Sequence, residues 1–416
     1  MTIEWIDPIW VSQDYPDAIW EVEGDMCRLD SGLIVISTFS GDGLSQWAIN
    51  PATNPPTVGP LHFDSSDTDW TTTPGFEVMG PPDPAGYVWG DICVTVPVGT
   101  NEWAVTGEAE GDLDNDGIHF PVAAFYTVNP STLEISRTGI DYHDATDAGY
   151  YEDNAYGARW GSKVAVTGQV DVDLPRIAIA SQDGSTVILD VPWPGWPDFN
   201  NRPGPLAVVG NVVMMFDQTL GISTWDLNGG GQIARITQDI GQGVWGWGMF
   251  TCTMSNGKIA AVCSGPYDPD YTDDTLPVKV AIITPSPLAV DTVIDIVPAA
   301  RSVGWTGGWK SNVRDIGQMP DGTLVVSYEI AHVMYLAFVD PTTETVTISD
   351  PLPFEQFGGT TFIARMEVLG QDQFAAAFIT SRGDQYGTWY TQTAMTRMIA
   401  GELDEYRTRF TGKART

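Results

Sequence analysis

The sequence predicts an all-β fold, a single β-propeller of seven four-stranded blades, with six or eight blades as alternatives. Three observations lead to this prediction. Helical periodicity is nearly absent. Short apolar or β-branched segments alternate with tight turns and long loops. The same two-hairpin unit recurs along the chain. The propeller is expected to cover 21–416, after an N-terminal arm over 1–20.

Two classes of tight turn define the repeating unit. The first is an Asp-Gly or Asn-Gly type turn between apolar strands, as in IGQMPDGTLVVSY, and it suits a hairpin because these residues tolerate positive φ. The second closes the later hairpin, often with proline at its second position, as in LAFVDPTTETVTI. A jelly roll or stacked sandwiches would not repeat this unit. The units begin near residues 22, 90, 162, 205, 248, 311 and 362.

The lengths of the connections separate two faces. In a propeller blade, the turns between strands one and two and between strands three and four share one face, which is called the tight-turn face below. The remaining connections form the long-loop face. They are expected at 64–88, 141–159, 192–204, 241–247, 264–278, 297–310 and 380–387. Because loops on a rigid scaffold usually carry binding, recognition is expected on the long-loop face.

The charge of the chain limits its partners. It has 19 Lys and Arg against 54 Asp and Glu, a formal net charge of −35. Such a surface excludes broad contact with nucleic acid phosphates and disfavours anionic membranes. The best apolar run, Pro205 to Phe216, is too short to span a bilayer, and the N-terminus lacks the basic start and apolar stretch of a secretory signal. We therefore expect no nucleic acid partner and no membrane insertion.

The four cysteines show no metal-binding or redox spacing. A two-residue loop at Asn256-Gly257 would put Cys263 opposite Phe250, which leaves Cys252 badly placed for a disulfide. The sequence therefore predicts four reduced, buried cysteines: Cys27, Cys93, Cys252 and Cys263.

Tryptophans gather at the links between blades. Ten of the 16 are expected there: Trp20, Trp70, Trp89, Trp160, Trp193, Trp196, Trp245, Trp247, Trp305 and Trp309. Their indoles are either flat platforms for sugars or a partner protein, or fillers of the gaps between blades. The candidate binding residues are Trp89, Trp247 and Trp309, because each stands at the entry to a first strand.

Three arginines, Arg28, Arg314 and Arg365, each fall in a predicted first strand. They either converge on a ligand carboxylate or form internal salt bridges, since a buried arginine is normally paired. Three carboxylates stand close to them in the sequence: Asp30, Asp315 and Glu367.

The segment VRDIGQMPDGTLVVSY, from residue 313 onward, resembles the repeat of sialidase-like propellers, in which an arginine precedes an apolar strand and an Asp-Gly turn. The segments 383–389 and 40–47 resemble the Asp-box of that family, outside its usual register. The resemblance implies a glycan-active enzyme with an arginine triad, a Tyr–Glu nucleophile pair and an acid Asp. Only the triad has candidates here.

The segment GDLDNDG over 111–117 alternates carboxylates before a glycine bend, and this spacing can wrap one Ca²⁺ ion with oxygen ligands. It resembles the calcium loops of FG-GAP-type propellers. However, Phe120 stands at the ninth loop position, where that family has Asp, and Ala123 stands at the twelfth. Either Ca²⁺ binds at Asp112, Asp114 and Asp116, or the segment is a solvated acidic loop.

Two functions remain open. The first is a non-enzymatic virion structural and recognition protein, such as a tail or adsorption component of a tailed phage, that binds other virion subunits or a host surface glycan. Its location would be the virion; the alternatives are the cytoplasm, or outside the cell without a recognisable signal peptide. The second is a sialidase-like or related glycan-active enzyme. No HExxH, GxSxG, P-loop or dinucleotide motif identifies a reaction.

Overall fold

The structure of the protein is a computed structural model. The structure describes residues 2–5, 9–10, 24–40, 43–53, 55–65, 88–89, 94–106, 109–110, 118–145, 156–170, 174–183, 187–190, 203–217, 221–229, 231–238, 240, 249–264, 278–297, 311–330, 333–352, 360–383 and 389–401. All regular structure in these ranges is β-strand. Within them, no helix has the length and apolar character needed to cross a membrane.

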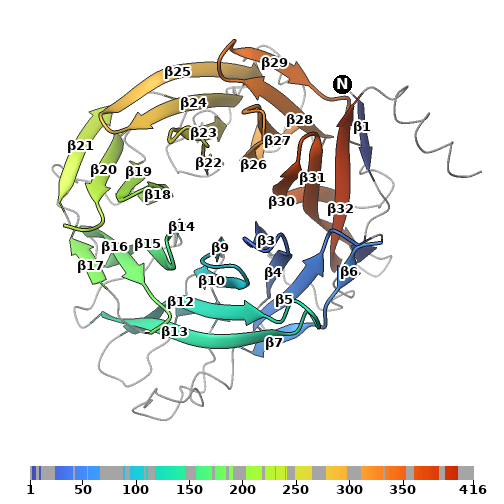
Figure 1. The fold of residues 1–416 in the computed structure, drawn as a ribbon, viewed down its shortest axis with the longest axis horizontal. Helices are drawn as coiled ribbons and strands as arrows, with labels where there is room; N and C mark the ends of the chain where they lie inside the picture. Colours follow the sequence, from blue (N-terminus) through green and yellow to red (C-terminus); the bar gives the residue numbers. More distant parts are fainter. Residues whose placement is uncertain are drawn as a thin grey trace, which may run out of the picture. The chain divides into compact units, whose positions relative to one another are not determined.

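The strands form seven sheets of at least four strands each, and the fold is a seven-bladed β-propeller, as predicted (Figure 1). In each of these sheets, antiparallel strands follow one another outward from the first strand. The seven sheets, numbered here as blades 1 to 7, fall into two compact units, which are described separately.

Unit 2 comprises Ile19–Gln238 and Pro285–Ala289 and holds blades 1 to 4. Blade 1 contains β3 (Gly24–Arg28), β4 (Ile34–Ser40) and β5 (Gly43–Asn50), and both β6 (Thr57–Val58) and β7 (His62–Ser65) pair with β5. Blade 2 contains β9 (Val94–Pro97), β10 (Glu102–Thr106), β12 (Ile118–Val128) and β13 (Ile135–Ala145). A separate pair joins β8 (Val88–Trp89) to β11 (Ala109–Glu110).

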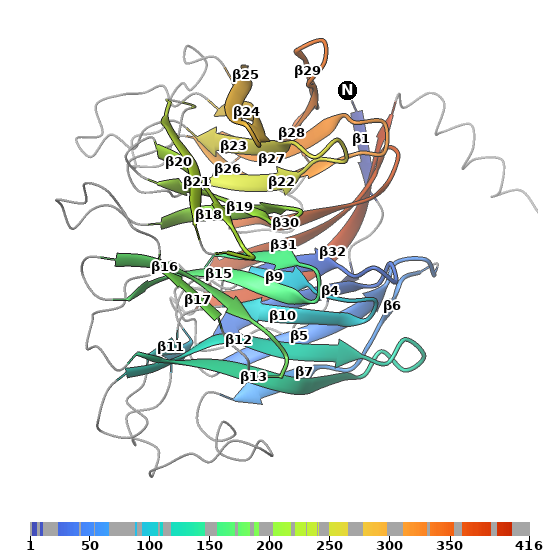
Figure 2. The same cartoon turned by 60° about the vertical axis from the view of Figure 1, so that its left-hand side comes forward.

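The other two blades of unit 2 have four strands each. Blade 3 contains β14 (Gly157–Trp160), β15 (Lys163–Val170), β16 (Leu174–Ala180) and β17 (Val187–Asp190). Blade 4 contains β18 (Pro203–Val209), β19 (Val212–Asp217), β20 (Gly221–Asp226) and β21 (Gln232–Thr237). The order of the strands can be followed by colour in Figure 2.

Unit 1 comprises Met1–Ala18, Asp239–Thr284 and Val290–Thr416. Blade 5 contains β22 (Met249–Thr253), β23 (Ile259–Ser264), β24 (Val278–Pro285) and β25 (Leu288–Val297). Blade 6 contains β26 (Ser311–Gln318), β27 (Leu324–Ile330), β28 (Val333–Asp340) and β29 (Thr345–Ile348). Blade 7 contains β30 (Thr360–Gly370), β31 (Gln373–Gly383), β32 (Trp389–Gly401) and β1 (Thr2–Trp5), with β2 (Ile9–Trp10) also paired to β32.

The N-terminal residues take part in the last blade. β1 pairs antiparallel with β32, and this register places Thr2 opposite Gly401 and Trp5 opposite Met398. The segment assigned in the sequence to an arm, 1–20, thus supplies the fourth strand of blade 7.

The predicted start of blade 3 was wrong. The sequence places it near residue 162, whereas the first strand of this blade is β14, which ends at Trp160. The segment from Lys163 is the second strand, because it pairs with β14 across the two-residue turn Gly161-Ser162. With only four residues, β14 carries too little strand pattern to be distinguished in the sequence from the end of the preceding loop.

Three turns between first and second strands share one backbone geometry. Gly32, Gly257 and Gly322 have φ of 85°, 78° and 95°, a left-handed conformation that glycine adopts without strain. In each turn a backbone N–H donates to the carbonyl oxygen of the residue four positions later and closes the hairpin. The N–O distance is 2.8 Å in all three turns: Leu29 to Leu33, Met254 to Lys258 and Met319 to Thr323.

This turn changes the predicted position of one cysteine. Because the blade 5 turn is longer than two residues, Cys263 lies opposite Met249 and not opposite Phe250. Cys27, Cys252 and Cys263 are free thiols, and Cys252 is half-buried rather than buried. Cys93 lies outside the described residues.

Consecutive antiparallel strands bring the first-to-second and third-to-fourth turns of a blade to the same end of its sheet. In blades 1 to 6 the described turns of these two kinds are short, as the division into faces requires. Most residues of the predicted long loops lie outside the described residues.

Apolar clusters hold neighbouring blades together inside each unit. In unit 2, Trp103 of β10 is fully buried, and its ring stacks on Tyr126 of β12 at a centroid distance of 5.7 Å. The cluster also contains Leu44 and Ala48 of blade 1, so it joins blades 1 and 2. In unit 1, equivalent clusters join blades 5 and 6 and blades 6 and 7.

Candidate functional site

The three candidate arginines all lie in first strands, as expected. Arg28 ends β3 and is exposed, in unit 2, while Arg314 of β26 and Arg365 of β30 are half-buried in unit 1.

Arg314 pairs with a carboxylate of its own blade. Its Nη2 lies 2.8 Å from Oε2 of Glu329 on β27, and their side chains are 25% and 14% exposed. The register between β26 and β27 shifts between Val313 and Asp315, so Arg314 is the extra residue of a β-bulge. A bulge re-aims the side chain that it carries. Sequence reasoning did not identify Glu329, which follows Arg314 by 15 residues on the neighbouring strand.

The neighbouring charges are used to join blades 6 and 7. Oδ2 of Asp315 accepts a hydrogen bond of 2.7 Å from the backbone N–H of Met366. In the opposite direction, Nη1 of Arg365 donates to the carbonyl oxygen of Arg314 at 3.2 Å. The guanidinium carbon of Arg365 also lies 4.5 Å from the centroid of the Phe250 ring on β22, which is a cation–π contact.

The Asp315 contact has a counterpart in unit 2. There a carboxylate oxygen of Asp25 on β3 accepts a hydrogen bond from the backbone N–H of Thr95 on β9. Asp25 and Asp315 both precede a turn glycine, Gly32 and Gly322, by the same number of residues. This shared spacing is a sequence signal for a contact between blades that the sequence analysis missed.

The thiol of Cys252 on β22 lies close to this charged group. Burial and the negative charges of Asp315 and Glu367 together raise its pKa to about 12. A thiol of that pKa is protonated at neutral pH, and the thiolate is the nucleophilic form. Cys252 is therefore unsuited to nucleophilic catalysis.

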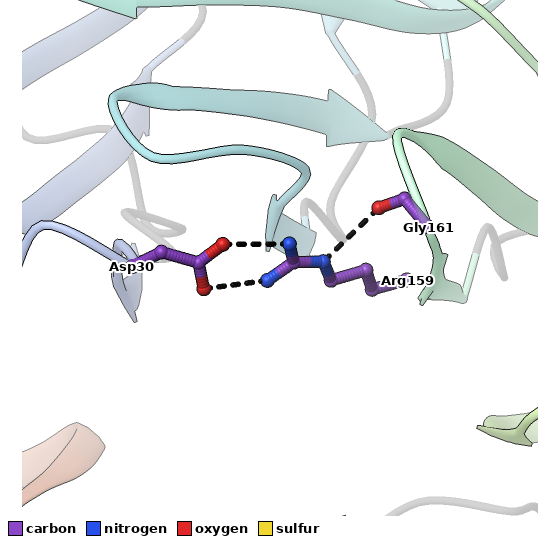
Figure 3. A network of polar contacts seen from close by, with 3 residues as sticks. All are labelled: Asp30, Arg159 and Gly161. Atoms are coloured by element: carbon purple, nitrogen blue, oxygen red, sulfur yellow. Dashed lines mark hydrogen bonds and ion pairs between the residues drawn. The ribbon is translucent and has the colours of Figure 1, made fainter.

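In unit 2, Asp30 pairs with a residue that sequence reasoning did not select (Figure 3). Nη1 and Nη2 of Arg159, on β14, each lie 2.7 Å from one carboxylate oxygen of Asp30, and Nε donates to the carbonyl oxygen of Gly161 at 3.1 Å. The hydrogen bonds from Arg159 hold the pKa of Asp30 below its usual value, and the carboxylate raises the pKa of Arg159. The 129 residues between the partners leave no local sequence signal.

Trp160 corrects the expected position of one blade-link tryptophan. It ends β14 beside the tight turn Gly161-Ser162 and so lies at the tight-turn end of its blade. Its side chain packs against the cluster that joins blades 3 and 4, and its Nε1 donates to Oδ1 of Asn211 at 3.3 Å. For this residue, packing between blades is the observed role.

The side chains of the remaining candidates lie outside the described part of the structure. Trp89 is in β8, where its backbone pairs with Ala109, and its side chain lies outside the described part. The other candidate residues lie outside the described residues altogether: Trp247, Trp309, Asp112, Asp114 and Asp116. Within the described ranges, no group of three or more His, Cys, Asp or Glu residues could hold a metal ion.

Taken together, the strand order and these contacts define the chain as a β-propeller protein whose first strands carry paired charges. No family model matches the sequence, and no curated protein matches it. Several solved structures, in contrast, are similar to this chain. The chain is similar to U3-55K, with a TM-score of 0.54, 9% identity and coverage of 96% of this chain and 98% of that one.

Two further solved structures are similar to this chain. A protein from Lactobacillus plantarum has a TM-score of 0.50 at 10% identity, with 91% of this chain and 100% of that chain covered. The WD40 domain of Neurospora crassa Pan2 has a TM-score of 0.48 at 10% identity, with 92% and 89% covered. At these identities the likeness extends to the fold alone.

Proposed function

We propose that this protein is a non-enzymatic binding propeller, a structural and recognition component of a virion. In this proposal it belongs to the tail or adsorption apparatus of a tailed phage. Its long-loop face binds a host surface glycan or another virion subunit.

One observation carries the non-enzymatic part of the proposal. Two of the three candidate arginines and a carboxylate beside them are engaged with the protein itself. Arg314 pairs with Glu329, and Arg365 donates to a backbone carbonyl and covers the Phe250 ring. Asp315 accepts two backbone hydrogen bonds, from Ile316 and Met366, both at 2.7 Å. A group that is held by several protein contacts serves the scaffold better than it serves a substrate.

The recognition part rests on surface chemistry. A chain of net charge −35 repels anionic glycans at long range, so attraction must come from short-range contacts. Exposed indoles provide large contact area at a low cost in side-chain entropy, which favours the candidates Trp89, Trp247 and Trp309.

Two experiments test the proposal. The first is mass spectrometry of virions purified from a culture that produces the protein, with immunogold labelling to locate it. Absence of the protein from washed virions would refute the virion role.

The second experiment measures binding of the purified protein to a glycan array and to host cells. Alanine variants of Trp89, Trp247 and Trp309 are compared with Ile233→Ala, whose exposed side chain lies on outer strand β21. Loss of binding in folded tryptophan variants but not in Ile233→Ala supports recognition by the long-loop face. Release of sugar from the array during incubation would instead establish the glycan-active enzyme.

A further inference from the structure

The Asp30–Arg159 pair reaches across a blade inside unit 2. Asp30 lies in the turn between β3 and β4 of blade 1, and Arg159 lies on β14 of blade 3. Figure 1 shows β9 of blade 2 between these two strands. An ion pair between successive blades would stabilise only the interface between those two blades. The Asp30–Arg159 pair instead spans two interfaces, between blades 1 and 2 and between blades 2 and 3.

The geometry of the guanidinium is fixed from both sides. Its two Nη atoms meet the two carboxylate oxygens of Asp30, and its Nε is bound to the carbonyl oxygen of Gly161 in its own turn (Figure 3). Bidentate pairing of this kind is stronger and more directional than a single contact. Arg159 is therefore tied to the blade 3 turn and to the blade 1 turn at once.

A second bond adds blade 2 to this connection. The backbone N–H of Ser31, the residue after Asp30, donates to the carbonyl oxygen of Thr100 at 2.9 Å. Thr100 lies between β9 and β10. The blade 1 turn thus contacts the corresponding turns of blades 2 and 3.

We propose that Asp30 and Arg159 form a salt-sensitive strap that holds the tight turns of blades 1, 2 and 3 in one arrangement. The strap lies at the surface, since the side chains of Arg159 and Asp30 are 36% and 47% exposed. Exposed ion pairs weaken as salt screens them, so high ionic strength releases the strap. The strap is independent of what the long-loop face binds.

The test measures hydrogen–deuterium exchange at the amide of Ser31, whose bond to Thr100 reports whether the turns are held together. In Arg159→Gln, the Ser31 amide is expected to exchange about three to five times faster than in the wild type at low salt. The changed residue lies in blade 3, so faster exchange at Ser31 reports the loss of a contact between blades and leaves the sequence of the blade 1 turn unaltered. At about 1 M NaCl, where screening is nearly complete, the two proteins should exchange alike.

Two controls make the outcome specific. The double variant Asp30→Arg with Arg159→Asp reverses the pair and should restore protection at low salt, expressed as a protection factor because the new side chain before Ser31 changes its intrinsic exchange rate. Asp291→Asn removes a comparable exposed pair in unit 1, with Lys258 at 3.0 Å, and should leave Ser31 unchanged.

The wild type alone supplies a further measurement if a variant does not fold. Added salt should speed exchange at Ser31 more than at Met319, whose amide closes a turn of the same geometry in blade 6. Unchanged Ser31 exchange in Arg159→Gln at low salt, or an acceleration that persists at about 1 M NaCl, would overturn the proposal.

Discussion

Removing the carboxylate of Glu329 should destabilise blade 6 through the arginine that it leaves behind. In Glu329→Ala, the guanidinium of Arg314 keeps its half-buried position but loses its partner at 2.8 Å. A hydrogen bond to a charged group contributes about 1.5–3 kcal/mol, whereas a fully exposed ion pair contributes about 0.2–1 kcal/mol. With side chains 25% and 14% exposed, this pair lies between those limits. The coupling free energy between the two residues is therefore expected to be about 1–2 kcal/mol.

A double-mutant cycle isolates that coupling. Glu329→Ala, Arg314→Ala and the double variant are compared by native-state hydrogen exchange at the paired amides of β26 and β27, because a chain of two units need not unfold in one step. The costs of the two single variants should add up to about 1–2 kcal/mol more than the cost of the double variant. Lys279 and Asp295 provide the matched control, since their charged atoms are 3.9 Å apart and Asp295 is 64% exposed.

The control pair should show a coupling of about 0.5 kcal/mol or less. A coupling of the same small size between Arg314 and Glu329 would refute the argument that Glu329 neutralises Arg314. Arg314 would then be available to a ligand, and the proposal that the protein is not an enzyme would lose its main support.

Three further results are expected. Gly59→Ala should destabilise unit 2 by about 1–3 kcal/mol in urea unfolding, since a Cβ at Gly59 would stand 2.4 Å from the carbonyl oxygen of Leu133; an unchanged midpoint would contradict this. Hydrogen bonds from Thr323 and Gln371 lower the pKa of Asp321, so their stabilisation is present above the ordinary Asp pKa and is lost as pH falls through the lowered value. The melting temperature of the wild type should therefore fall toward that of Asp321→Asn in strong acid. A difference between the two melting temperatures that does not change with pH would contradict this role of Asp321. If the predicted loop with Asp112, Asp114 and Asp116 binds Ca²⁺, the melting temperature should be higher in Ca²⁺ than in EGTA. Equal melting temperatures would mean that the loop is a solvated acidic loop.

The repeating architecture could be predicted because its signals are local. A segment such as IGQMPDGTLVVSY contains both strands and the turn, and the turn glycine, Gly322, adopts the positive φ that its sequence suggests. The predicted blade count came from seven two-hairpin units, of which six show a first-hairpin turn of this kind. The first strand of blade 3 was missed since β14, with four residues and a Trp-Gly end, has too little apolar pattern to stand out from a loop.

The partners of the charged residues could not be predicted for a different physical reason. Arg314 was recognised as a first-strand residue, but its contact with Glu329 depends on a bulge that no turn signal announces. The Asp30–Arg159 pair depends on how three blades are arranged, which is information that neither segment contains. Register was also sensitive to turn length, because the longer blade 5 turn moved Cys263 by one position.

The pairing of β1 with β32 has a consequence for how the protein is made. Thr2 faces Gly401, so β1 cannot pair its backbone until β32, the last strand described, has been synthesised. Until then, one edge of blade 7 has no strand to cover it, and an open edge invites pairing with another chain. Contacts between such distant parts of a sequence form slowly because the intervening loop must close first. During synthesis this edge is therefore exposed to pairing with another chain, and a fused domain that holds β1 away from β32 should lower the yield of native protein.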